Sequence, residues 1–184
     1  MKKTSNFFEI ITFVLLLLSM TPVSADNSYA EDRALIEDLA ARYLFALDFD
    51  DAEAYVNTFT EDGILDIGTG EIKGRKAIFD VINGMNQREL EAAANDTSGL
   101  HRSTGRHNIS NLAIKIDGNR AKMVAYWFHY GNNNPERRAA VDSYGHYEDD
   151  LVKVNGQWLF SKRRIYNENR ADWAVPPERG NPSW

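Results

Sequence analysis

Apolar side chains recur at three- and four-residue intervals in the first half of the chain, which is the spacing of one face of an α-helix. The clearest stripe consists of Ile36, Leu39, Tyr43 and Leu47. The pattern predicts a first helix that begins at Ser28, where Glu31 completes a capping box, and ends near Asp48. Two further helices are expected at 52–59 and 76–83, the latter with a fraying polar extension.

The second half of the chain is rich in aromatic and β-branched residues, which is typical of strands. Strands are expected at 106–116, 120–131, 141–154 and 157–166. Asn155-Gly156 predicts a hairpin turn between the last two. Helices followed by an antiparallel meander indicate an α+β domain, with the helices packed on one face of the sheet.

The N-terminal segment has the features of an export signal. Lys2 and Lys3 precede an apolar run at 10–20, and a small-x-small cleavage site ends at Ala25. The run is short for the roughly 20 apolar residues of a membrane-spanning helix, although an uncleaved anchor is the alternative. We expect cleavage after Ala25 and export to a periplasm or the medium, without a stable membrane anchor.

Cleavage would divide the chain into a signal peptide at 1–25, one domain at 26–170 and an irregular tail at 171–184. The 184 residues include no cysteine, which excludes disulfides, thiolate nucleophiles and cysteine zinc sites. The formal net charge of −6 becomes more negative once the signal peptide leaves, because that segment is basic. An acidic domain without a basic run does not suit nucleic acid. Since the sequence has no metal or phosphate motif, we expect no metal and no cofactor.

Candidate chemistry begins at Asp48, which directly follows the apolar end of the first helix. A carboxylate beside a buried face is costly unless it is paired. One interpretation makes Asp48 a cap for the chain reversal, together with Asp50 or Asp51. The other pairs it with one of the four histidines, at positions 101, 107, 129 and 146. A carboxylate on one imidazole nitrogen fixes the tautomer and makes the other nitrogen a better general base.

Four motifs, in this order, resemble the SnoaL-like branch of the nuclear transport factor 2-like superfamily: Tyr43-x4-Asp48, AYVNTFTEDG, GRHNISN and VNGQWLFSKRRI. That branch includes scytalone dehydratase, bile-acid 7α-dehydratase and the hexachlorocyclohexane dehydrochlorinase. The resemblance runs from about Glu31 to Ile165. It implies a cone-shaped α+β barrel, in which N-terminal helices pack on a strongly curved, mainly antiparallel sheet around an internal cavity.

The resemblance also implies catalytic residues. It pairs Asp48 with His107 as a dyad inside the cavity. Tyr43 would donate a hydrogen bond to a developing oxyanion or leaving hydroxyl. Arg163, on the last strand, would orient a polar substituent of the substrate at the cavity mouth.

The expected substrate-contacting residues are Tyr55, Phe59, Phe128, His129, Tyr130, Arg163 and Ile165. The bile-acid enzyme carries a further acidic residue on its middle strand, and this chain has none at the matching place. Scytalone dehydratase has a second histidine in that region, a part that His129 could take. Because neighbouring residues of a strand point to opposite faces, only one of His129 and Tyr130 can face the cavity. Which of the two does so stays open.

A structural condition attaches to His107. In a strand, residues two apart point to the same face, so His107 and Ile109 point to one face and Leu112 and Ile114 to the other. Strict alternation would therefore turn His107 away from the face that Leu112 and Ile114 occupy. One extra residue near Asn111, forming a β-bulge, would bring both sets to the same face. The catalytic interpretation requires this bulge.

The favoured function is an exported, cofactor-independent lyase or isomerase, dehydratase-like, that acts on a small and mainly apolar ring compound. The alternative is a non-catalytic domain that holds an apolar ligand in the same cone. A third interpretation is a structural partner domain whose cavity is filled by side chains. Apolar residues on both faces of the strand at 120–131 also predict a homodimer or higher homo-oligomer, formed through the outer face of the sheet.

Overall fold

A computed structural model describes residues 24–100 and 105–169. The helices are α1 (Ser24–Asp48), α2 (Ala52–Val56) and α3 (Arg75–Ala94). The strands are β1 (Phe59–Asp66), β2 (Glu71–Lys73), β3 (Arg106–Asp117), β4 (Arg120–Gly131), β5 (Ala140–Val154) and β6 (Gln157–Asn167). The predicted tail, and the predicted signal peptide apart from its last two residues, lie outside the described residues.

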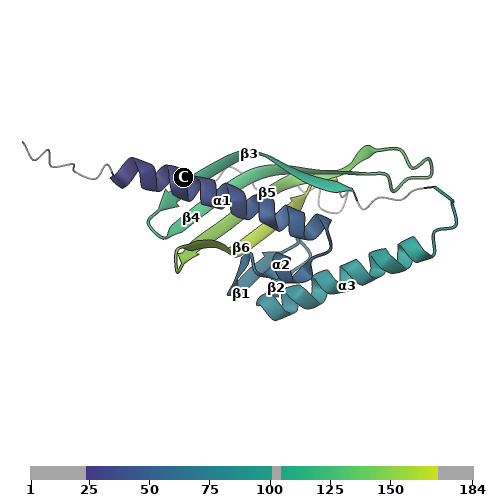
Figure 1. The fold of residues 1–184 in the computed structure, drawn as a ribbon, viewed down its shortest axis with the longest axis horizontal. Coiled ribbons are helices and arrows are strands. Elements are labelled where there is room, and N and C mark those ends of the chain that lie inside the picture. The colour runs from purple at the N-terminus through teal and green to yellow at the C-terminus, as the bar shows by residue number, and fades with distance from the viewer. Residues whose placement is uncertain (1–23, 101–104, 170–184) are drawn as a thin grey trace, which may run out of the picture.

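The strands form one six-stranded sheet in the order β2-β1-β6-β5-β4-β3. All neighbouring pairs are antiparallel except β1 and β6, which run parallel. In Figure 1, α1 lies across the sheet beside β3, while α2 and α3 lie toward its β1–β2 end. The predicted α+β architecture is therefore present, but the sheet is open rather than a closed barrel, with β2 and β3 as its edges.

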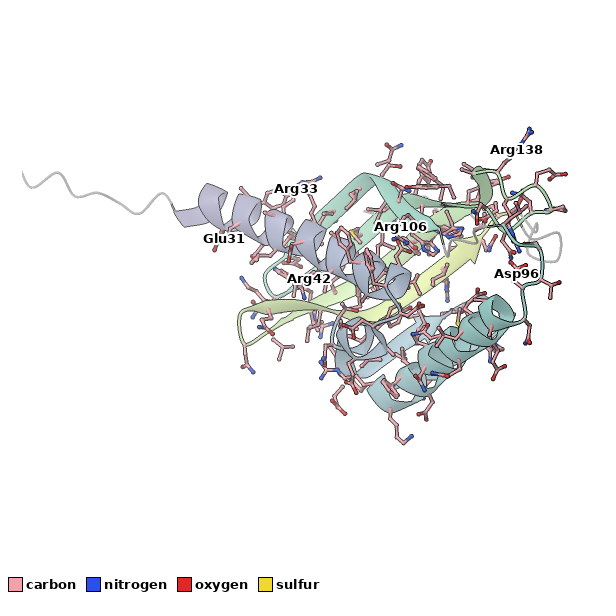
Figure 2. All side chains as sticks on the ribbon, turned by 45° about the vertical axis from the view of Figure 1, so that its right-hand side comes forward. Glu31, Arg33, Arg42, Asp96, Arg106 and Arg138 are labelled. Atoms are coloured by element: carbon pink, nitrogen blue, oxygen red, sulfur yellow. The ribbon has the colours of Figure 1, made fainter. Side chains whose placement is uncertain are left out.

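Helix α1 buries one stripe and exposes the other side. The buried apolar residues, Ile36, Leu39, Ala40, Tyr43, Leu44 and Ala46, include most of the predicted stripe. Arg33 and Arg42, spaced along α1 in Figure 2, pair with acidic residues one turn away at 2.9 and 2.8 Å. The helix ends at Asp48 as expected, but it begins before Ser28, so Ser28 is not its cap. No helix among the described residues is long and apolar enough to cross a membrane.

Strand β3 contains the bulge that the position of His107 requires. Between the pairs Ser110–Tyr126 and Ala113–Val124, β3 has one residue more than β4. Asn111 lies in this step with a φ of 54°, in the left-handed region that Asn tolerates better than most residues. The extra residue reverses the parity of the strand, so His107 faces α1 as the apolar residues beyond the bulge do.

The bulge can be tested through Asn111. Asn111→Val should lower the free energy of unfolding by about 1–3 kcal/mol, because a β-branched residue is strained at positive φ. Asn111→Gly should change it by no more than about 0.5 kcal/mol, because glycine adopts this conformation freely. Urea unfolding of both variants measures the difference. Equal losses in the two variants would mean that Asn111 acts through its side chain and not through its backbone conformation.

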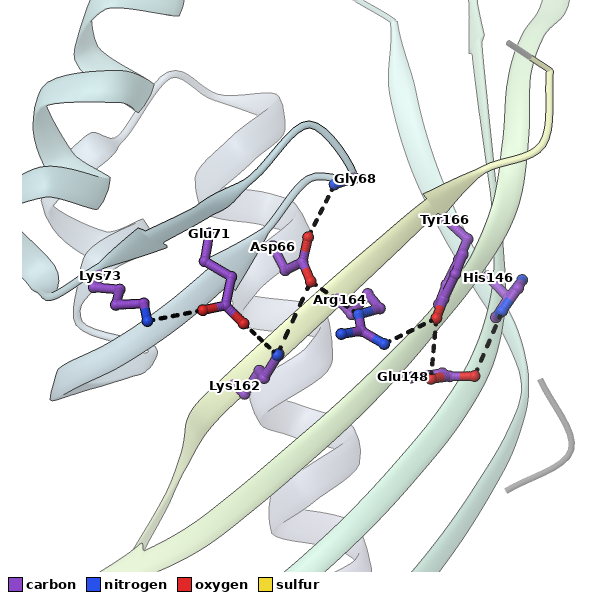
Figure 3. Close-up of polar contacts among 9 residues, drawn as sticks. All are labelled: Asp66, Gly68, Glu71, Lys73, His146, Glu148, Lys162, Arg164 and Tyr166. Carbon is purple, nitrogen blue, oxygen red and sulfur yellow. Dashed lines mark hydrogen bonds and ion pairs between the residues drawn. The ribbon is translucent and has the colours of Figure 1, made fainter. Parts of the chain in front are cut away.

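A polar network crosses the outer face of the sheet and links β2, β1 and β6 (Figure 3). Lys162 on β6 contacts Glu71 at 2.7 Å and Asp66 at 4.0 Å. Arg164 donates to Asp66 at 2.9 Å and to the Tyr166 hydroxyl at 3.2 Å. These contacts join side chains of β1 and β6, the parallel pair of the sheet.

Candidate functional site

Asp48, the last residue of α1, binds His107 with both carboxylate oxygens. Oδ1 lies 2.6 Å from His107 Nδ1, and Oδ2 accepts the backbone N–H of His107 at 2.9 Å. The Asp48 side chain is 6% exposed and the His107 side chain 23%. The N-cap of α2 is instead Asp51, which accepts the Ala54 N–H at 2.8 Å. The pairing of Asp48 with a histidine is therefore present, and the residue that caps the next helix is Asp51.

This geometry fixes the state of the His107 ring. A carboxylate accepts hydrogen bonds, so the proton of the neutral imidazole lies on Nδ1 and the lone pair lies on Nε2. Nε2 of His107 makes no hydrogen bond with a described residue. A neutral imidazole held in one tautomer, with an available nitrogen, has the arrangement of a general base.

The dyad lies in the wall of a small pocket, of about 190 Å³, between the end of α1, α3 and the sheet. The lining residues are Leu47, Asp48, Asp50, Met85, Asn86, Glu89, His107, His129, Gly131, Asn133 and Asp142. Pockets for drug-sized ligands usually have about 300–1,000 Å³. Most of the lining residues have polar side chains, and the volume suits a ligand smaller than a drug molecule.

A second histidine–carboxylate pair lies next to the first. His129 Nδ1 is 2.5 Å from Asp142 Oδ1, and the ring centroids of His129 and His107 are 4.5 Å apart. His129 therefore faces the pocket, and Tyr130 faces the other side of the sheet. The described residues hold no group of three or more His, Asp or Glu side chains arranged to bind a metal ion.

Tyr43 lies in the core rather than in the pocket, contrary to its predicted contact with substrate. Its hydroxyl is 2.6 Å from the hydroxyl of Tyr55, and both side chains are almost completely buried. Burial raises the pKa of both phenols above the ordinary value, so each stays protonated. Tyr43 and Asp48 are separated by about 500° of helix turn, or roughly 140° around the axis, and so face different surroundings.

Arg163 also lies in the core and not at a cavity mouth. It is fully buried, and its Nε and Nη2 donate to the two oxygens of Asp149 at 2.8 Å each. The guanidinium carbon lies 4.0 Å from the ring centroids of Tyr43 and Phe160 and 4.2 Å from that of Tyr147. An extra residue in β6 between Phe160 and Lys162 puts Arg163 on the same inner face as Phe160, and that face is packed core at this point.

The remaining predicted contacts also lie outside the pocket. Phe59 is buried in the core, and Ile165 is partly buried against it. Phe128 and Tyr130 are 36% and 41% exposed on the outer face, because they alternate with the inward-facing Trp127 and His129. Of the residues predicted from the sequence, Asp48, His107 and His129 are the ones that the fold brings together in this pocket.

Several pocket residues were missed by the sequence reasoning. Met85, Asn86 and Glu89 come from the polar extension expected to fray, which is helical as far as Ala94. Asn86 continues the four-residue spacing of Ile78 and Ile82, the other buried residues of α3, and this spacing is a signal that could have been used. Asp142 becomes recognisable only when the pairing of β4 with β5 is known, since no sequence motif joins it to His129.

A family of SnoaL-like domains matches this chain over residues 28–164, which is most of its length. Among curated proteins, none matches the sequence.

Solved structures share the fold. A protein of unknown function from Mycobacterium tuberculosis is 25% identical, with a TM-score of 0.65 over 84% of this chain and 80% of that one. A provisionally named scytalone dehydratase from Novosphingobium aromaticivorans is 23% identical, with a TM-score of 0.61 over 77% and 87%. A Catenulispora acidiphila protein in complex with S-DNPA is 25% identical, with a TM-score of 0.62 over 77% and 96%.

Proposed function

The chain belongs to the SnoaL-like domain family, and on that premise we propose that it is an exported, cofactor-independent lyase or isomerase. Its substrate is a small ring compound from which His107 removes a proton. The favoured reaction is dehydration, the elimination of water next to a carbonyl or another acidifying group.

The observation that carries this proposal is the two-point contact between Asp48 and His107. A carboxylate that only neutralised charge would need one contact with the imidazole. Here the second oxygen holds the backbone N–H of the same residue at 2.9 Å, so ring and backbone are fixed together. A base that is fixed before the substrate binds loses less entropy in the transition state.

In the proposed reaction, Nε2 of His107 accepts a proton from the carbon next to the activating group. The electron pair of the broken C–H bond forms the new double bond, and the C–O bond to the leaving hydroxyl breaks. The proton on Nε2 then completes the departing hydroxide as water, which returns the imidazole to its neutral form. His129 lines the same pocket, with its ring centroid 4.5 Å from that of His107.

The size of the pocket and its apolar positions support a single-ring substrate. Leu47 and Met85 supply apolar lining beside the dyad, in a volume of about 190 Å³. Similar folds hold small molecules, as the S-DNPA complex of the Catenulispora protein illustrates for that protein.

One observation favours the alternative of a non-catalytic binding domain. Tyr43, the expected donor to a developing oxyanion, makes its hydrogen bond to Tyr55 inside the core. Loss of a single oxyanion donor lowers turnover by about 10²- to 10³-fold in other enzymes. A domain with the same pocket but without such a donor can bind a ring compound and leave it unchanged.

Hydrogen exchange with solvent separates the two functions even when the natural substrate has not been identified. A panel of cyclic ketones and hydroxyketones is incubated with the 26–184 chain in D2O and followed by proton NMR. Proton abstraction by His107 exchanges the acidic C–H of a bound compound even where no elimination follows. The function proposed here requires exchange above the buffer rate for at least one compound, and a binding domain gives none.

Export and assembly are part of the proposal. We propose that the mature chain forms a homodimer through the outer face of the sheet. The exposed aromatic side chains on that face are Tyr126, Phe128, Tyr130 and Tyr144, carried by the adjacent strands β4 and β5. Exposed apolar patches of this kind often mark interfaces.

A further inference from the structure

The lining of the pocket is unusually acidic for a site that accepts a ring compound. Four carboxylates contribute to it, those of Asp48, Asp50, Glu89 and Asp142. No lysine or arginine among the described residues lines it, so positive charge in the described wall depends on the two histidines. Asp48 and Asp142 already hydrogen-bond to those histidines.

Asp50 differs from the other acids in how it is held. Its φ is 59°, in the left-handed region, at the chain reversal after α1. The side-chain amide of Asn86, itself 8% exposed, donates to the backbone carbonyl of Asp50 at 2.9 Å. Non-glycine residues in this conformation persist where their surroundings hold them, and such residues cluster at functional sites.

The Asp50 carboxylate is exposed and, within the described part of the chain, has no partner that neutralises it. It makes no hydrogen bond or ion pair with any described residue, whereas the neighbouring Asp48 and Asp51 each accept hydrogen bonds. A carboxylate in a pocket wall attracts a cation or a hydrogen-bond donor and repels an anion.

We infer that the pocket selects its ligand by charge and that Asp50 is a specificity-determining residue. Ring compounds that carry an ammonium or hydroxyl group are favoured, and ring carboxylates are disfavoured. This inference rests on the proposed function, because it concerns the same pocket. It narrows the substrate class from a small ring compound to a neutral or cationic one.

Three single-ring probes of similar size test the charge selection: benzylamine, benzyl alcohol and benzoate. Affinities are measured by NMR titration at about pH 8, where benzylamine is a cation and benzoate an anion. The probes are titrated against the 26–184 chain, following the ring signals of His107 and His129. Benzylamine should bind about tenfold more tightly than benzoate, with benzyl alcohol between them.

The variant Asp50→Asn tests whether the charge of this residue causes the preference for benzylamine over benzoate. Asparagine tolerates the left-handed conformation at least as well as aspartate, so the fold should be retained. The variant should lose most of the difference between benzylamine and benzoate while its affinity for benzyl alcohol stays unchanged. The matched control is Glu53→Gln, which removes one negative charge from an exposed residue of α2 outside the pocket and should leave all three affinities unchanged.

Benzoate binding as tightly as benzylamine would overturn the inference, and so would the absence of binding by all three probes. An equal response of Asp50→Asn and Glu53→Gln would overturn the role of Asp50, since net charge alone would then explain the order. The affinity order does not depend on turnover. If no compound exchanges its C–H with solvent but benzylamine still binds more tightly than benzoate, the proposed catalysis fails and the charge selection stands. If a compound does exchange but the affinity order is absent, the charge selection fails and the proposed catalysis stands.

Discussion

His107→Gln should reduce the solvent-exchange rate of an accepted compound to that of the buffer. Glutamine cannot accept and return a proton near neutral pH, so His107 would no longer act as a base. Asp48→Asn should lower the rate on the order of 10³- to 10⁴-fold, because asparagine removes the charge and can favour the wrong imidazole tautomer. The measurement is the exchange rate by NMR, with the thermal melting of each variant alongside.

The matched control for this pair is His146→Gln. His146 is also a buried histidine with a carboxylate partner, Glu168 at 2.7 Å, but it does not line the pocket. The His146→Gln variant should therefore exchange the compound at the same rate as the unmodified protein. If Asp48→Asn destabilises the fold by about 2–5 kcal/mol, as a core deletion does, Asp48 is primarily structural. If Asp48→Asn changes neither rate nor stability, the dyad has no role in catalysis.

The largest loss of stability is expected from Asp149→Asn. Both partners of the Asp149–Arg163 pair have side chains with no exposed surface. Removing one charge leaves the other buried without compensation, which typically costs about 3–5 kcal/mol. Urea unfolding should show this loss as a lower midpoint at an unchanged slope.

The control is Asp150→Asn, one residue along the same strand and on the opposite face. Asp150 pairs with Lys122 at 3.3 Å, and both side chains are more than half exposed. Exposed pairs contribute about 0–1 kcal/mol, so little change is expected. A double variant, Asp149→Leu with Arg163→Met, should recover most of the loss, because apolar residues can replace a buried pair. Similar small losses for Asp149→Asn and Asp150→Asn would contradict the interpretation.

The sequence predicted the architecture because it depends on local signals. The pairing of Asp48 with His107 was implied by the family resemblance. The stripe from Ile36 to Tyr43 identifies α1 and its buried face. The parity conflict between His107 and Leu112 predicted a bulge, and the structure has one at Asn111. The unpaired carboxylate at the end of an apolar helix pointed to a partner for Asp48.

The sequence could not predict contacts that depend on strand register and packing depth. Arg163 lies among polar neighbours in the sequence, and its counterion precedes it by 14 residues on the adjacent strand. Only the register of β5 against β6 reveals that pair. Tyr43 was assigned to the site by the family resemblance, but its hydrogen-bond partner, Tyr55, comes from a different helix.

The position of α1 along β3 has a consequence for aggregation. As an edge strand, β3 would offer free backbone groups to a strand of another molecule. Side chains of α1 occupy three of these groups. The contacts are Asp48 with the His107 N–H at 2.9 Å, Arg33 with the Leu112 carbonyl at 3.3 Å, and Tyr29 with the Ile114 carbonyl at 3.3 Å.

The carboxylate that orients the imidazole therefore also protects the sheet against strand-to-strand aggregation. Selection for a fold that resists aggregation would retain this aspartate even in a protein that had lost its chemistry. The second carboxylate–histidine pair, on the interior strands β4 and β5, has no such edge to protect.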